Sequence, residues 1–159
     1  MKALILYYSR SGTTANLARA ISAAIDAPTA EISCPRYGPG WLRYLRAGYD
    51  SVKGRHPPIS VPDTVWGNYD LLILGSPIWT SYPALPLRAF LKQGHELPPR
   101  IALFFTYGGH SPPEKAVNFI SDRLLRQPIA TLAVQQERVL RGEFDDDLKA
   151  FTSQLSTDN

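Results

Sequence analysis

Along the whole chain, short apolar runs typical of buried strands alternate with segments of helical periodicity. The runs are continuously apolar, as in strands that are buried on both faces. The helical segments place hydrophobic residues three and four positions apart, as in helices with one buried side. The expected strands are residues 2–8, 30–33, 71–75, 101–105 and 129–134, and the expected helices are residues 14–25, 85–93, 114–126 and 143–155. This alternation predicts an α/β fold in three layers, with a doubly wound parallel sheet between two layers of helices.

The length of 159 residues predicts a single domain, residues 1–159, with one irregular connection at residues 35–68. That connection is rich in Gly, Pro, Tyr and Trp, and loops of this length are usually functional or partly structured. We expect it to hold a short helix that ends at Gly54, with Trp41 packed inward. The hydrophobic residues on one face of that helix are Trp41, Leu45, Tyr49 and Val52.

Basic residues are concentrated in the same connection, whereas the whole chain has a formal net charge of only +3. Between Ser33 and Ser60, Asp50 is the only acid against five basic residues: Arg36, Arg43, Arg46, Lys53 and Arg55. Such a segment could be a docking face, a lid over a ligand site or a nucleic-acid patch. No recognised nucleic-acid motif accompanies it, so we expect a solvated amphipathic helix and no nucleic-acid partner.

Several classes of function lack the residues that they require. The single cysteine, Cys34, excludes an internal disulfide, cannot hold zinc by itself, and is best explained as a buried thiol. The histidines at positions 56, 95 and 110 are scattered, so no metal site is expected. Every apolar run is far below the ~20 residues of a membrane span, and the start of the chain lacks the long apolar region of a signal peptide. We therefore expect a cytoplasmic protein.

The loop after the first expected strand has the composition of an anion site. Residues 9–14 read Ser-Arg-Ser-Gly-Thr-Thr and lie directly before a helix. Backbone N–H groups at a helix N-terminus are unpaired and favour anions, and hydroxyls also donate to phosphate oxygens. The loop has neither the Gly-Lys-Ser/Thr of nucleoside-triphosphate loops nor the Gly-x-Gly-x-x-Gly of dinucleotide sites. The alternative is an ordinary helix cap rich in Ser and Thr.

Two further loops follow strands that lie at the same edge of the predicted sheet, where ligands of such sheets bind. Residues 75–83 read Gly-Ser-Pro-Ile-Trp-Thr-Ser-Tyr-Pro, and residues 106–110 read Thr-Tyr-Gly-Gly-His. Both place aromatic side chains beside the candidate anion site. Together the three loops suit a flat aromatic ligand that carries a terminal phosphate.

The three loops together resemble the flavodoxin-like family, in order and spacing, over residues 1–155. YYSRSGTT is similar to the flavodoxin phosphate loop, GSPIWTSYPALPLRAFL to the flavin loop of the branch with Gly-x-Pro-Ile-Trp, and TYGG to the third flavin loop. The resemblance implies a five-stranded sheet of order 2-1-3-4-5 and a bound FMN. It implies that the phosphate lies against Ser9, Arg10, Ser11, Gly12, Thr13 and Thr14. The ring would lie between Pro77, Ile78, Trp79 and Thr80 on one side and Thr106, Tyr107, Gly108 and Gly109 on the other.

Proteins of the same fold but of other functions do not fit these residues. A receiver domain needs acids after its first and third strands, where this chain has Ser9 and Ser76. A low-molecular-weight phosphatase needs Cys-x5-Arg after the first strand, whereas Cys34 lies elsewhere and Gly40 stands six residues after it.

The resemblance leaves two redox functions open. One is an electron carrier that docks to a redox partner protein, and the other is an FMN-dependent NAD(P)H oxidoreductase acting on quinones or similar small acceptors. The chain is basic, unlike most flavodoxins that shuttle electrons, and residues 77–83 lack the glycine that permits a low-energy peptide flip. Both features favour the enzyme, whereas the lack of a recognisable nicotinamide site favours the carrier. His110 would lie near the ring, where a cation stabilises an anionic reduced flavin, although it could equally be an exposed loop residue.

Overall fold

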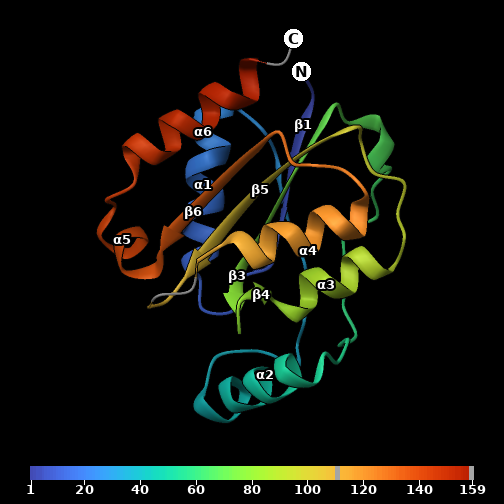
Figure 1. The fold of residues 1–159 in the computed structure, drawn as a ribbon, viewed down its shortest axis with the longest axis vertical. Helices are drawn as coiled ribbons and strands as arrows, with labels where there is room; N and C mark the ends of the chain where they lie inside the picture. Colours follow the sequence, from blue (N-terminus) through green and yellow to red (C-terminus); the bar gives the residue numbers. More distant parts are fainter. Residues whose placement is uncertain (110–111, 158–159) are drawn as a thin grey trace.

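The computed structural model describes residues 1–109 and 112–157 and has a central twisted sheet (Figure 1). Its strands are β1 (Ala3–Tyr7), β2 (Thr29–Glu31), β3 (Leu71–Trp79), β4 (Tyr82–Pro83), β5 (Arg100–Tyr107) and β6 (Ala130–Gln135). The order is β2-β1-β3-β5-β6 with all neighbours parallel, and β4 pairs antiparallel with β3. Apart from the short β4, this is the predicted order 2-1-3-4-5, so the expected α/β architecture is confirmed.

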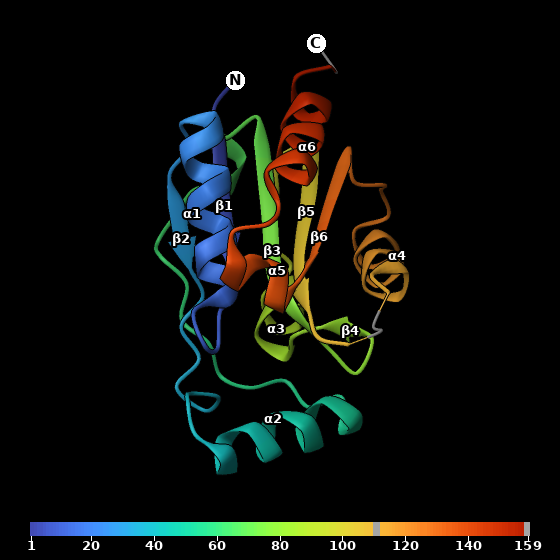
Figure 2. The ribbon, with the colours of Figure 1, turned by 90° about the vertical axis from the view of Figure 1, so that its left-hand side faces the viewer.

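Helices cover both faces of the sheet (Figure 2). Helix α1 (Thr13–Ile25), the short α5 (Gln136–Arg141) and α6 (Asp145–Thr157) lie on one face, and α3 (Leu85–Lys92) and α4 (Glu114–Leu124) lie on the other. Alternate residues of each strand pack against the helices on opposite faces of the sheet. In β1, Ile5 joins the apolar cluster under α1 and α6, while Leu4 and Leu6 join the cluster under α3 and α4. Burial on both faces explains why these strands are continuously apolar.

Some boundaries differ from the sequence-based expectation. β2 begins one residue early and ends at Glu31, while Ser33 instead forms an isolated antiparallel bridge with Ser60. β3 continues beyond Gly75 to Trp79 because its last residues pair with β5 and β4. The six-residue α5, ended by Gly142 at φ 70°, was not expected, because it is too short to show helical periodicity.

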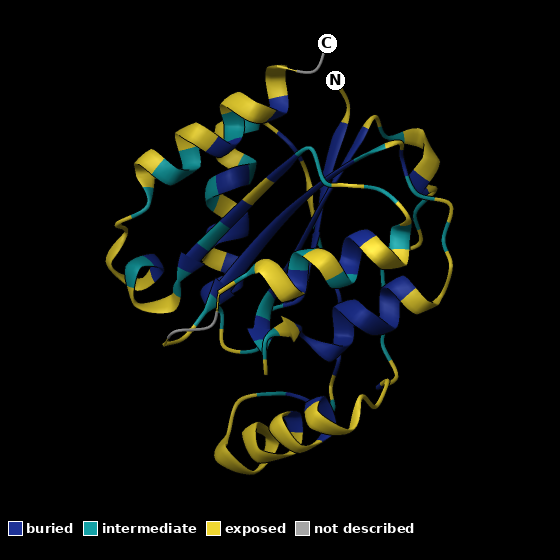
Figure 3. Ribbon diagram, viewed as in Figure 1, coloured by how far each residue is buried: buried dark blue, intermediate teal, exposed yellow. Residues whose placement is uncertain are grey.

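Helix α2 (Trp41–Lys53) departs most from the expected packing. The helix ends as predicted at Gly54, which adopts the left-handed conformation with φ 65°. It lies beyond the carboxyl ends of the strands, outside both helical layers (Figures 1 and 2), and almost all of it is exposed (Figure 3). The expectation that Trp41 packs inward is wrong, because its side chain is 72% exposed. The residues that α2 buries are the small or polar Ala47, Asp50 and Ser51.

The connection that carries α2 still contributes to the core after the helix. Trp66, in a short 3-10 helix (Trp66–Asn68), is buried with its ring centroid 5.1 Å from that of Phe90. Cys34 is buried as expected, and burial raises the pKa of its thiol. Among the described residues, no helix combines the length and apolar character needed to cross a membrane.

Candidate ligand-binding site

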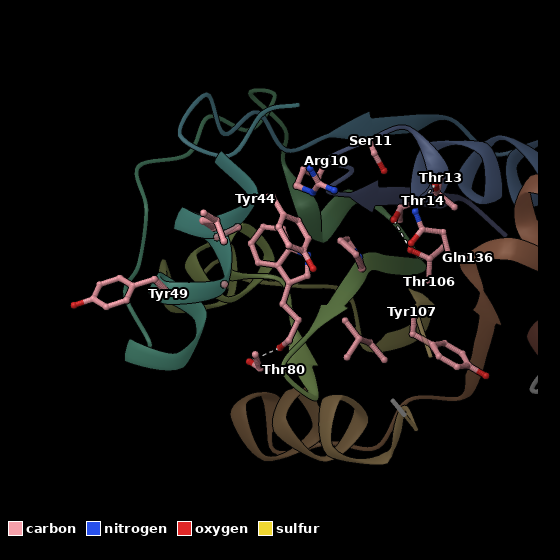
Figure 4. Close-up of a pocket in the computed structure, with 17 residues that line it drawn as sticks. Arg10, Ser11, Thr13, Thr14, Tyr44, Tyr49, Thr80, Thr106, Tyr107 and Gln136 are labelled. Carbon is pink, nitrogen blue, oxygen red and sulfur yellow. Dashed lines mark hydrogen bonds between the residues drawn. The ribbon is translucent and has the colours of Figure 1, made fainter. Parts of the chain in front are cut away.

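A pocket of about 570 Å³ opens at the carboxyl ends of the strands (Figure 4). The three predicted loops form most of its wall, and α2 lies across from them. The structure brings together eleven of the fourteen residues singled out from the sequence: Arg10, Ser11, Thr13, Thr14, Pro77, Ile78, Trp79, Thr80, Thr106, Tyr107 and Gly108. Ser9, Gly12 and Gly109 do not line it. Sequence reasoning missed the remaining lining residues: Tyr44, Leu45, Ala47, Gly48, Tyr49 and Gln136.

The first loop is folded into a cradle by Ser9. Its Oγ accepts hydrogen bonds from the backbone N–H groups of Gly12, at 3.1 Å, and Ala15, at 3.2 Å. Gly12 has φ 95°, a conformation that favours glycine. The N–H groups of residues 10, 11, 13 and 14 donate to no atom of the described chain. The Ser9 side chain therefore holds the loop in shape through these two hydrogen bonds. Several other backbone N–H groups at the start of α1 remain available to a bound anion.

The side chains of this loop have different roles. Thr14 and Thr106 share a buried hydrogen bond of 2.7 Å between their hydroxyls, which joins the first loop to the third. Gln136 Nε2 donates weakly to Thr13 Oγ1, at 3.4 Å. Ser11 is exposed at the pocket wall and makes no side-chain hydrogen bond with a described residue. Ser11 and Thr13 are therefore the hydroxyls best placed to meet an anion.

The second loop is a tight hairpin between β3 and β4. Thr80 and Ser81 have φ values of 51° and 74°, the double left-handed conformation of a type I′ turn. Such turns usually carry Asn or Gly, and a β-branched residue is strained there. Thr80 Oγ1 donates to Trp79 O at 2.8 Å and lies 2.8 Å from Ser51 Oγ of α2. The turn thus adopts positive φ without glycine, and the hydrogen bonds of the Thr80 and Ser51 hydroxyls support it.

Trp79 is fixed by a cluster of aromatic residues behind it. Its ring meets those of Tyr8 and Tyr37 edge to face, with centroids 5.7 and 5.4 Å away. The Tyr8 hydroxyl donates to Tyr37 O, and the Tyr37 hydroxyl donates to Asp50 Oδ2 at 2.7 Å. Burial raises the pKa of both tyrosines, so both stay neutral. The indole of Trp79 is therefore held in a defined orientation at the pocket wall.

Asp50 anchors α2 to the body of the protein. Its carboxylate is almost fully buried and also accepts a 2.8 Å hydrogen bond from Arg36 Nε. That hydrogen bond is the main reason why the pKa of Asp50 is lowered from its ordinary value. Nearly two helical turns before Asp50, the ring of Tyr44 lies under the guanidinium of Arg10, which is 5.2 Å from the ring centroid. These contacts hold α2 as the outer wall of the pocket.

The third loop contributes Thr106, Tyr107 and Gly108. Gly109 lies beside the pocket, and its carbonyl accepts a hydrogen bond from Gln135 Nε2. His110, a candidate for a role near the ligand, lies outside the described residues. One feature of the sequence could have pointed to the α2 residues of the pocket wall. It is the pair of small residues Ala47 and Gly48 in the middle of an amphipathic helix.

Solved structures resemble this chain over most of its length. A flavoprotein from Lactobacillus acidophilus, crystallised in complex with FMN, is 27% identical with a TM-score of 0.66, and the match covers 88% of this chain and 97% of that one. The chain has a flavodoxin-like fold. An NADH:FMN oxidoreductase in its apo form is 21% identical (TM-score 0.57, covering 98% of this chain and 87% of that one). A flavodoxin from the domain Archaea is 17% identical (TM-score 0.52, 97% and 93%). No family model and no curated protein matches the sequence.

Proposed function

We propose that this flavodoxin-like protein, of the Gly-x-Pro-Ile-Trp branch, binds FMN and carries electrons through it. The observation that carries the proposal is the convergence of an anion cradle and aromatic walls in one pocket. The flavoprotein from Lactobacillus acidophilus, which has this fold and is 27% identical, binds FMN, and this supports the choice of flavin.

The residues of the pocket fit FMN at both of its ends. The free N–H groups of residues 10, 11, 13 and 14 and the hydroxyls of Ser11 and Thr13 would hold the phosphate. Trp79 and Tyr107 are the aromatic residues that the second and third loops contribute to the pocket wall, and Thr80, Thr106 and Gly108 line the same pocket. An apolar, partly enclosed wall suits a flat aromatic group that must also exchange electrons at its edge.

When bound, FMN supplies the redox chemistry, because it accepts and gives electrons that no side chain of the pocket can carry reversibly. The protein would orient the ring, through Trp79 and its two tyrosines, and set the charge around it. The described pocket wall contains one cation, Arg10, and no carboxylate. An electropositive surround favours anionic reduced flavin and thereby raises the reduction potential.

A second candidate is an FMN-dependent NAD(P)H oxidoreductase acting on quinones or similar acceptors. The position of α2 favours it, because Leu45 and Gly48 give the pocket a second wall facing the loops. A Cβ on Gly48 would meet nothing within 4 Å, so the space beside that wall is open. Room for a second planar molecule is a requirement of such an enzyme and not of a carrier.

Reconstitution with FMN followed by stopped-flow reduction distinguishes the two functions. The FMN-loaded protein is mixed anaerobically with NADH or NADPH, and flavin absorbance is followed. A carrier is reduced slowly without a partner protein, whereas an oxidoreductase is reduced fast and then reoxidised by a quinone. Failure to bind FMN, or binding of riboflavin as tightly as FMN, would overturn the proposal for the cofactor.

A further inference from the structure

Helix α2 exposes an unusual amount of hydrophobic surface. Of the eleven large hydrophobic side chains that are strongly exposed in the described part of the chain, six belong to this helix. Five of the six form what we call the apolar stripe: Trp41 (72% exposed), Leu42 (65%), Leu45 (56%), Tyr49 (56%) and Val52 (74%). At 100° per residue the five fall within a sector of about 100° along the helix, the width of a typical buried helix face.

Most of the apolar stripe faces the solvent, and Leu45 and Tyr49 within it also border the pocket. An amphipathic helix of a globular domain normally turns its apolar side toward the core. In α2 the buried residues are Ala47, Asp50 and Ser51, whose mean direction on the helix is roughly opposite to that of the stripe. Hydrogen bonds of Asp50 and Ser51 to the body fix this orientation. The helix is therefore held with its apolar side toward the solvent, where an uncovered patch of this kind indicates an interaction site.

Cations lie along one edge of the apolar stripe. At 100° per residue, Lys53 and Arg46 both follow Leu42 at that edge, and both are exposed. The guanidinium of Arg55 lies 5.5 Å from the centroid of the Tyr49 ring, beyond the end of the helix. The only acid of the helix, Asp50, is buried and paired with Arg36. The exposed surface of α2 is thus apolar and positive, without an exposed negative charge.

We propose that α2 binds the surface of an anionic lipid bilayer, with the apolar stripe inserted at the boundary between headgroups and acyl chains. A face with Trp and Leu and a polar face with Arg are typical of helices that lie in the plane of a membrane. Long basic side chains extend from the edge of the stripe to the phosphates above it. Trp and Tyr are favoured at this depth because their rings are amphipathic.

The charge argues against the other occupants of the stripe. Pairing with a second copy of the chain would bring two sets of exposed cations together with no acid between them. The helix also stands outside the body of the protein (Figure 2), where an extended bilayer surface can meet it. The cytoplasmic leaflet of a membrane carries the required negative charge.

Membrane binding would place the bilayer at the mouth of the pocket, because Leu45 and Tyr49 belong both to the stripe and to the pocket wall. In Figure 4 the Tyr49 ring points outward, away from the loop residues. This inference stands without FMN, since it rests on α2 alone.

Vesicle co-sedimentation tests the proposal directly with the full-length protein. Vesicles of phosphatidylcholine with one quarter phosphatidylglycerol are compared with vesicles of phosphatidylcholine alone. We expect binding at least ten times stronger to the anionic vesicles and a blue shift of the Trp41 emission that is absent in Trp41→Phe. Replacing Arg46 and Lys53 by Gln should weaken binding about fivefold for each charge removed. Equal binding to both kinds of vesicle, or none to either, would overturn the proposal.

Leu42 and Leu140 form a matched pair for the apolar contribution, since both are 65% exposed and Leu140 lies on α5. Leu42→Gln should weaken vesicle binding several-fold, whereas Leu140→Gln should leave it unchanged. Neither residue lines the pocket, and circular dichroism melting checks that both variants fold. Sedimentation velocity without lipid should give a monomer. A dimer that Leu42→Gln dissociates would show that a second copy covers the stripe and would contradict the membrane proposal.

Discussion

Thr14 and Thr106, 92 residues apart in the sequence, share a hydrogen bond of 2.7 Å between their hydroxyl groups at the base of the pocket. Thr14 lies in the first turn of α1 and Thr106 near the end of β5, and both are almost fully buried. The bond joins the loop proposed to hold a phosphate to the loop proposed to hold the ring. The relative position of the two loops therefore depends on two small side chains.

Thr14→Val should lower the free energy of unfolding by about 1–3 kcal/mol, because the buried hydroxyl of Thr106 loses its partner. Thr106→Val should act similarly through Thr14. The double variant should be little worse than either single one, since it leaves no unpaired hydroxyl. Urea denaturation of the four proteins measures the coupling, and additive losses would contradict the contact. The exposed Thr131 on β6 serves as a control position for Thr→Val.

Ser11→Asp should weaken FMN binding by at least ~30-fold, or about 2 kcal/mol, by placing a carboxylate against the phosphate dianion. Binding of riboflavin, which has no phosphate, should change little. Ser11 is exposed, so the fold should be unaffected, and Ser11→Asn controls for the size of the new side chain. Titrations followed by flavin fluorescence give the affinities. Equal losses for FMN and riboflavin would show that the loop does not hold the phosphate.

Trp79→Ala should lower the affinity for FMN about three- to tenfold, in line with about 0.5–1.5 kcal/mol for an aromatic pair. Flavin fluorescence, quenched by an adjacent indole, should recover in the variant. Trp66→Phe controls for the loss of an indole elsewhere in the protein, because Trp66 packs on Phe90 and does not line the pocket. Unchanged affinity and quenching in Trp79→Ala would mean that the indole does not contact the flavin.

The sequence predicted the sheet and the loops at its carboxyl edge because both depend on local patterns. Continuous apolar runs such as residues 71–75 are buried on both faces, and the connections after them must meet at one edge. The position of α2 could not be predicted in this way. Periodicity shows that Trp41, Leu45 and Val52 share a face, but not whether that face meets the core or the solvent. Here the polar Asp50 and Ser51 decide the orientation, through partners far away in the sequence.

The hairpin at Thr80 shows a second limit of sequence reasoning. The absence of glycine argued against positive φ in this loop, because local preference penalises it. Tertiary contacts override that preference, since Ser51 of α2 supports Thr80 across the pocket edge. Contacts between side chains distant in sequence, such as this one, leave no trace in a single sequence.

The buried carboxylate of Asp50 predicts a dependence of stability on acid pH. Its pKa in the folded protein lies below the ordinary value, chiefly because of the hydrogen bond from Arg36. A lowered pKa stabilises the fold above the ordinary value of ~4, and this contribution is lost as the pH falls toward the folded-state pKa. Asp50→Asn should therefore cost about 1–3 kcal/mol at neutral pH, and the difference from the native protein should shrink below pH ~4. Urea midpoints across this range test it, with the exposed Asp146→Asn as control. A difference that is constant with pH would contradict the ion pair.

The surroundings of Arg88 predict opposite effects on stability for two variants that break its hydrogen bond to Ser51. The residue is only 8% exposed, and its guanidinium forms no salt bridge with a described residue. Nη2 donates to Ser51 Oγ at 3.0 Å, while Nε has no partner, and burial lowers the pKa of the group. A buried cation without a carboxylate is costly, and among the described residues the Ser51 hydroxyl and the faces of Tyr82 and Phe119 offset that cost.

Ser51→Ala should destabilise the protein by about 1–3 kcal/mol. It removes the hydroxyl that accepts a hydrogen bond from Nη2 of the buried Arg88, and it also removes the hydrogen bond between Ser51 and Thr80. Arg88→Met should be neutral or stabilising, because it removes the buried charge and keeps an apolar side chain of similar length. Thermal unfolding of both variants shows whether each substitution lowers or raises the stability of the protein. The double variant should recover most of the stability lost in Ser51→Ala, because the charge that needs the hydroxyl is gone. Strong destabilisation by Arg88→Met would instead show that the guanidinium itself holds α2 and the hairpin together.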